Sequence, residues 1–332
     1  MDRITAYSPF RVSFGGGGSD INPYCDRYGA AVLNATIDRG VMVTYTRDDY
    51  ELEVSSRDFL RSVIVSSKGD SEGVLNGILE LFRKYGITKG RIGINSGVPP
   101  GSGLGSSSAL MNAILKILYK TEGKDSGPDD LAGDAFNLES DYFGIVLGKQ
   151  DPYAISNGGL KLMEFMGGSV KTSKFDLENE TAVELEKRIL LVYTGSTRES
   201  SSVLRKQVTL SQEERSPVIE ILHSIRETAL MMNRALHNND LKEFSELVNR
   251  GWELKKAMNP DVSTDHIDQM IDRAMKSGAS SARLMGGGKE GFILLLSEPE
   301  KMKYLQKEMM GLSSFAIRIS FDPAGTRLIR SF

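Results

Sequence analysis

The 332-residue sequence is poor in several residue types on which many enzymes depend. Cysteine occurs once, at Cys25, so no disulfide can form within the chain, and a reducing compartment is favoured. The only histidines are His223, His237 and His266, all in charge-rich, helix-like stretches of the second half. We therefore expect a mechanism without histidine, in which carboxylates and hydroxyls bind any metal ion. That donor set suits Mg²⁺.

A strong charge imbalance and long apolar runs are also lacking. The 41 Lys and Arg nearly balance the 44 Asp and Glu, and the net charge of −3 gives no electrostatic case for a nucleic acid or an anionic membrane. No apolar run approaches membrane-spanning length, and no signal-like segment opens the chain. We expect a cytoplasmic monomer or homodimer, with one large domain or two.

Glycine, in contrast, is abundant, with 34 residues, and it gathers in a few loops. The central one, PPGSGLGSSSA at 99–109, lies between a strand-like run at 91–98 and a stretch from Ala109 onward with apolar residues at helical spacing. Glycines permit close approach of a ligand, and the first N–H groups of a helix favour an anion. The segment predicts a phosphate cradle, most simply for ATP; a flexible loop with a serine N-cap is the alternative. It is no Walker P-loop, because the lysine of that motif is missing.

Two other segments contain candidate polar residues. A strand-like run at 4–14 carries Arg11 and leads into GGGGSD, which ends at Asp20. Further along, GKQDPYAISNGG places Asp151 before a proline. Local sequence alone also allows plainer interpretations: Arg11 as a surface strand residue, Asp20 as a helix N-cap and Asp151 as a turn former.

The central loop resembles the characteristic motif of the GHMP kinases, the superfamily of galactokinase, homoserine kinase and mevalonate kinase. PFRVSFGGGGSD resembles the first motif of that superfamily, GKQDPYA resembles its Gly-x-Gln-Asp-x-Tyr-Ala element, and GASSARLMGGGKEG at 278–291 resembles its third motif. Three departures stand out: Ser19 in place of threonine, Pro152 where glutamine is frequent, and Lys289-Glu290 interrupting the last glycine run. The first motif and the YTGSTR stretch ending at Arg198 are most like the branch that acts on heptose phosphates.

The resemblance covers nearly the whole chain and implies an α+β fold of the GHMP kinase type. An N-terminal domain like ribosomal protein S5 domain 2 is expected over residues 1–175, followed by a ferredoxin-like C-terminal domain over residues 176–332.

The resemblance also implies roles for individual residues. Asp151 is expected to be the catalytic base, and Arg11 to stabilise the developing negative charge. Ser107 and Glu139 are expected to bind Mg²⁺. The residues expected to bind the nucleotide phosphates form one continuous run: Pro100, Gly101, Ser102, Gly103, Leu104, Gly105, Ser106, Ser107 and Ser108. Those expected to bind the sugar are Gly17, Gly18, Ser19, Asp20, Arg198 and Gly287.

The expected activity is transfer of phosphate from ATP to the anomeric hydroxyl of D-glycero-D-manno-heptose 7-phosphate, on the way to nucleotide-activated heptose. A free-sugar kinase of the fucokinase or galactokinase kind is the alternative within the superfamily. A nucleotide-dependent sugar sensor without turnover would be expected to lack Arg11 or Asp151, and both are present. A decarboxylase of phosphorylated mevalonate is disfavoured by the sugar-type first motif.

Overall fold

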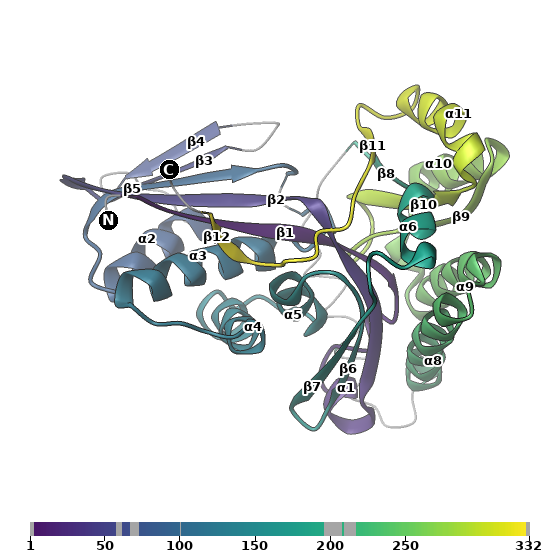
Figure 1. Ribbon diagram of the computed structural model, residues 1–332, viewed down its shortest axis with the longest axis horizontal. Helices are drawn as coiled ribbons and strands as arrows, with labels where there is room; N and C mark the ends of the chain where they lie inside the picture. Colours follow the sequence, from purple (N-terminus) through teal and green to yellow (C-terminus); the bar gives the residue numbers. More distant parts are fainter. Residues whose placement is uncertain are drawn as a thin grey trace.

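The computed structural model describes residues 3–57, 62–66, 73–99, 101–195, 208 and 217–329. Two of the predicted site residues, Pro100 and Arg198, lie outside these ranges. The described chain forms two parts, a large sheet with helices lying along it and a smaller sheet with helices of its own (Figure 1). The expected α+β fold is therefore confirmed.

The large sheet is built around two long strands, β1 (Arg3–Gly15) and β2 (Ala30–Glu51), which pair antiparallel. Its other strands are β3 (Glu53–Arg57), β4 (Ser62–Ser66), β5 (Lys89–Ser96), β6 (Leu160–Met166), β7 (Ser169–Lys174) and β12 (Arg327–Ile329). The main order is β12-β1-β2-β5-β3-β4, with β6 joining β2 to β7. Strands β2 and β3 follow each other closely in the chain, but β5 lies between them, antiparallel to β2 and parallel to β3.

Helices of the first half lie along this sheet below its strands in the view of Figure 1. They are α2 (Val74–Lys84), α3 (Ser106–Glu122), α4 (Pro128–Asn137) and α5 (Gln150–Asn157), with the short α1 (Tyr24–Tyr28) beside β6. Helix α4 is followed directly by a π-helical turn, η1 (Leu138–Tyr142). The buried face of α3 packs on β1 and β2.

The smaller sheet has the order β11-β8-β10-β9. Its strands are β8 (Ile189–Tyr193), β9 (Ala279–Leu284), β10 (Phe292–Ser297) and β11 (Ala316–Arg318). The helices of the second half are α6 (Glu180–Lys187), α8 (Pro217–His237), α9 (Leu241–Met258), α10 (Asp265–Lys276) and α11 (Pro299–Met310), with a 3₁₀ turn, η2 (Pro260–Val262). Of these, α9, α10 and α11 contact strands of the small sheet, whereas α8 packs on β2 and β1 of the large sheet.

One hydrophobic core runs through both parts. It includes Phe10 and Val43 of the large sheet, Ile114 of α3, Leu191 of the small sheet and Met232 of α8. The last described strand, β12, returns to pair with β1 at the edge of the large sheet. The predicted division of the chain into two domains at residues 175 and 176 stays a prediction.

Among the described helices, none combines the length and apolarity needed to cross a membrane.

Candidate active site

Arg11 and Asp151 meet where the end of β1 passes the first turn of α5. Arg11 Nε donates to Asp151 Oδ1 and Arg11 Nη2 donates to Asp151 Oδ2, each at 2.7 Å. The arginine side chain is 4% exposed, while the aspartate side chain is 24% exposed. Such a two-point contact between guanidinium and carboxylate fixes the orientation of both groups. The Asp151 carboxylate is thus held rigidly with one part open to solvent.

The central glycine loop is attached to this pair. Arg11 Nη1 donates to the carbonyl of Gly103 at 2.6 Å, and the Arg11 backbone N–H donates to the carbonyl of Leu104 at 3.0 Å. Gly105 has a φ of +75°, and a Cβ there would lie 3.5 Å from Asp151 Oδ2 and 2.9 Å from Ile155 Cδ1. Glycine is needed at this position for both its backbone conformation and its lack of a side chain.

The start of α3 is suited to an anion. Gly105 is the N-cap of α3 and has no side chain with which to accept the first N–H groups of the helix. Those groups and the helix dipole favour a negatively charged ligand. The Ser102 hydroxyl nearby is buried and has no hydrogen-bond partner within the described part of the chain. The phosphate cradle stays a prediction, which the glycine N-cap of α3 supports.

Ser107 and Glu139, predicted as metal ligands, are in contact. Ser107 Oγ donates to Glu139 Oε2 at 2.7 Å, and Glu139 Oε1 is buried without a hydrogen-bond partner among the described residues. Burial raises the pKa of Glu139 to about 7, partly offset by hydrogen bonds from Ser108 and Ser107. Glu139 lies on the π-helical turn η1, a distortion frequent at functional sites.

This pair fits a hard cation such as Mg²⁺, which binds hydroxyl and carboxylate oxygens. Across the described residues, no group of three or more His, Cys, Asp or Glu side chains could hold a metal ion. Mg²⁺ at Ser107 and Glu139 would therefore need phosphate and water oxygens to complete its shell, as is usual for this ion at nucleotide sites.

The first glycine loop is organised by its own polar residues. Ser19 Oγ donates to the carbonyl of Gly16 at 2.7 Å, so this hydroxyl is used within the loop. Asp20 accepts the N–H of Gly18 at 2.8 Å and the N–H of Gln150 at 3.0 Å. Burial raises the pKa of Asp20, and backbone hydrogen bonds oppose that rise. Asp20 thus joins the loop that contains Gly17 to the segment just before Asp151.

The third glycine motif packs directly on the central loop. Gly286 has a φ of +70°, and a Cβ there would lie 2.5 Å from the Cα of Gly103. The N–H of Phe292 donates to the carbonyl of Ser102 at 3.1 Å, which fastens the other side of the motif. The Lys289-Glu290 interruption does not prevent this contact. Gly287, expected to bind sugar, is half-buried within the same turn.

Two buried cations near these loops were missed by our sequence interpretation. Lys255 of α9 is 9% exposed and donates to the carbonyl of Gly286; Arg283 of β9 is 4% exposed and donates to the carbonyl of Phe14. A signal for Lys255 existed, because Val248, Trp252 and Lys255 share one helix face at spacings of four and three, and that face is otherwise apolar. The adjacent pair Lys255-Lys256, however, is typical of a solvent-exposed helix surface.

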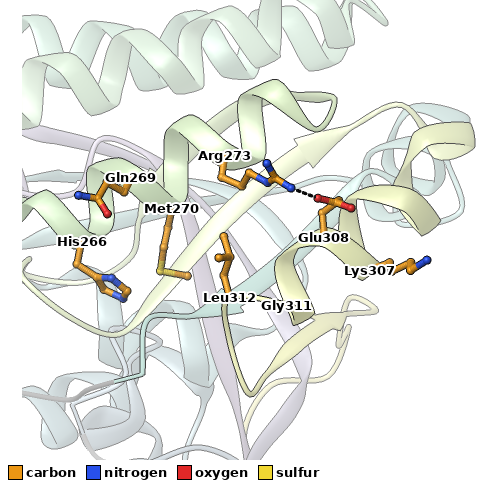
Figure 2. Close-up of a pocket in the computed structure, with 8 residues that line it drawn as sticks. All are labelled: His266, Gln269, Met270, Arg273, Lys307, Glu308, Gly311 and Leu312. Carbon is orange, nitrogen blue, oxygen red and sulfur yellow. Dashed lines mark hydrogen bonds and ion pairs between the residues drawn. The ribbon is translucent and has the colours of Figure 1, made fainter.

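A separate pocket of about 430 Å³ lies in the C-terminal part, between α10 and α11 (Figure 2). Met270 and Leu312 form its floor, and the ion pair of Arg273 with Glu308 crosses one side. His266 lines it too, with Nε2 at 3.1 Å from the carbonyl of Thr194. None of the residues predicted for catalysis lines this pocket.

Comparison with known proteins agrees with this geometry. The model of the GHMP kinases N terminal domain matches residues 73–159, and that of the GHMP kinases C terminal matches residues 232–309. The sequence is 31% identical to D-glycero-alpha-D-manno-heptose 7-phosphate kinase of Campylobacter jejuni, over 98% of this chain and 99% of the relative.

Solved structures give the same result. A putative sugar kinase from Campylobacter jejuni is 30% identical and superposes with a TM-score of 0.78, covering 100% of this chain and 99% of the other. A D-glycero-D-manno-heptose 1-phosphate kinase from Bacteroides thetaiotaomicron is 24% identical, with a TM-score of 0.76 over 99% of each chain, and shares the fold. The chain belongs to the GHMP kinase family.

Proposed function

We propose that this protein is an ATP-dependent kinase that phosphorylates the anomeric hydroxyl of D-glycero-D-manno-heptose 7-phosphate to give the 1,7-bisphosphate. The observation that carries this proposal is the Arg11–Asp151 pair, held against the central glycine loop in a chain whose full-length relative is a heptose 7-phosphate kinase. The expected compartment remains the cytoplasm, and the expected assembly a monomer or homodimer.

Asp151 is the base in this proposal. A carboxylate has about four lone-pair positions, so Asp151 can accept a hydrogen bond from the acceptor hydroxyl while its pair with Arg11 persists. In phosphoryl transfer the protein contributes mainly by positioning the reactants and neutralising charge, and a loose transition state lets the hydroxyl lose its proton late. The Arg11 guanidinium, fixed beside that hydroxyl, then stabilises the negative charge that develops there.

The nucleotide lies over the start of α3 in this proposal, with its phosphates on the backbone N–H groups of the 101–108 segment. Ser107 and Glu139 are the residues that would hold Mg²⁺, which would neutralise charge on the phosphates. Asp20 and the loop of Gly17 and Gly18 lie next to Asp151 through the Asp20–Gln150 contact, which supports placing the sugar there. Arg198 and Pro100 remain predictions from the sequence.

The test is ATP consumption over a panel of acceptors, with NMR to locate the new phosphate. The panel contains heptose 7-phosphate, the same heptose without phosphate, heptose 1-phosphate, L-fucose, galactose and mevalonate. We expect heptose 7-phosphate to give the highest kcat/KM and a product phosphorylated at the anomeric oxygen. A higher kcat/KM for a free sugar would replace this function with a fucokinase- or galactokinase-like one. Binding without turnover of any acceptor would favour a sensor.

A further inference from the structure

Lys255 and Arg283 are buried basic side chains without an acidic partner among the residues that the structure describes. Neither forms an ion pair with any residue of the described ranges, although Lys255 is 9% and Arg283 is 4% exposed. Each donates to one backbone carbonyl, of Gly286 and Phe14 respectively, and Arg283 Nε is buried with no hydrogen-bond partner among the described residues. Burying an uncompensated charge is unfavourable, so a buried basic group is normally paired with a negative group, loses its proton, or binds an anion when one is present.

The two side chains come from different elements and face the same loops. Lys255 reaches the carbonyl of Gly286, whose backbone packs on Gly103, and Gly103 accepts from Arg11. Arg283 reaches Phe14, the residue before the first glycine loop. Burial, together with the positive charges of Arg283 and Arg11, lowers the pKa of Lys255 to about 7, while the charge of Asp20 opposes this. Burial also lowers the pKa of Arg283 to about 10.

We propose that Lys255 and Arg283 form a binding site for the phosphate group that the sugar substrate already carries. This inference rests on the proposed function, and it assigns a phosphomonoester to a site separate from the nucleotide cradle. A dianion between the two side chains would supply the missing negative charge and accept from the unsatisfied Arg283 Nε. Arginine and lysine donors to phosphate are among the stronger hydrogen bonds in proteins.

The placement favours the acceptor over the nucleotide. The nucleotide elements, which are the start of α3 and the Ser107–Glu139 pair, follow the central loop in the chain. Arg283 instead donates to the carbonyl of Phe14, just before the first glycine loop. The negative charge of Asp20, in that same loop, acts to raise the pKa of Lys255. Arg11 lies between the two groups, bonded to the central loop and interacting electrostatically with both cations. The sugar would then lie with its anomeric end at Asp151 and its phosphate at Lys255 and Arg283.

The test compares kcat/KM for heptose 7-phosphate and for the same heptose without phosphate, in wild type, Lys255→Met and Arg283→Gln. We expect each variant to lose about ten- to a hundredfold on the phosphorylated sugar, the range for hydrogen bonds to charged groups. On the unphosphorylated sugar we expect a loss of less than about threefold. Arg250→Gln on the exposed face of α9 is the matched control and should change neither value. The site would be overturned if each variant lost the same factor of kcat/KM on both sugars, or lost kcat/KM on neither.

A binding measurement separates this inference from the proposed function. Inorganic phosphate without ATP, compared with chloride at equal ionic strength, should raise the unfolding temperature of wild type more than that of Lys255→Met or Arg283→Lys. That difference would support the site even if no heptose is turned over. If wild type phosphorylates heptose 7-phosphate but phosphate stabilises all variants equally, the kinase assignment stands and the site is wrong. The unfolding temperature also shows whether each variant is folded.

Discussion

Arg11 and Asp151 are 140 positions apart in the chain and are joined by two hydrogen bonds of 2.7 Å. A third bond, from Arg11 Nη1 to the carbonyl of Gly103, ties the pair to the glycine loop. Strand β1, helix α5 and the loop before α3 are therefore fixed at one point. A change at Asp151 should disturb chemistry at that point far more than it disturbs nucleotide binding.

Asp151→Asn removes the proposed base and weakens its contact with Arg11. We expect turnover to fall by roughly two to four orders of magnitude, the range that general-base catalysis supplies, with a small change in ATP affinity. Steady-state kinetics and ATP titration measure the two effects. Asp48→Asn, which removes a surface ion pair with Arg91, is the control and should leave turnover unchanged. If Asp151→Asn keeps wild-type turnover, Asp151 is not the base and only shapes its turn.

Ser107→Ala and Glu139→Gln should raise the Mg²⁺ concentration needed for half-maximal rate, because each removes one of two protein oxygens suited to the ion. Rates measured from limiting to saturating Mg²⁺ test this. Ser140→Ala, beside Glu139 on the same turn, should behave as wild type. If both variants keep the wild-type Mg²⁺ dependence, the ion is bound elsewhere.

Gly286→Ala should lower both stability and turnover, because its Cβ would lie 2.5 Å from Gly103 and would displace the central loop. Gly168→Ala is a matched control, since Gly168 also has a positive φ, of +80°, but no heavy atom within 4 Å. Gly168→Ala should lose about 1–2 kcal/mol of stability through backbone strain alone and should keep normal turnover. Thermal unfolding and turnover measurements distinguish the two variants. Equal effects in both would mean that the Gly286–Gly103 contact is unimportant.

Lys255→Met should stabilise the ligand-free protein near neutral pH while impairing use of the phosphorylated sugar. The folded-state pKa of Lys255 is lowered to about 7 from an ordinary 10.5. Between these values the unfolded chain holds a proton that the folded chain has lost, so the lysine's destabilising effect is largest at and below about pH 7 and fades as pH rises towards 10.5.

The unfolding free energies of wild type and Lys255→Met, compared from pH 6 to pH 10, measure this effect. The variant should be more stable by an amount of the order of a few kcal/mol at the low end, and the difference should narrow as pH rises. A constant difference across this range would show that the burial of Lys255 does not control its charge.

Features that depend on neighbouring residues could be predicted from the sequence. The glycine loops, the start of α3 and the strand before it follow from local preferences, since glycine alone tolerates positive φ readily and apolar spacing defines the buried helix face. The motifs also identified Arg11, Asp20, Glu139 and Asp151 as candidates, and the structure brings Arg11 to Asp151 and Glu139 to Ser107.

Contacts between distant segments were decided by tertiary structure alone. That β5 separates β2 from β3, and that β12 returns to β1, depends on pairing across long loops, which no local pattern encodes. The same holds for Lys255 and Arg283. Lys255 lies on an otherwise apolar helix face, but no local pattern shows that the packing of α9 and β9 against the glycine loops buries both cations without an acidic partner among the described residues.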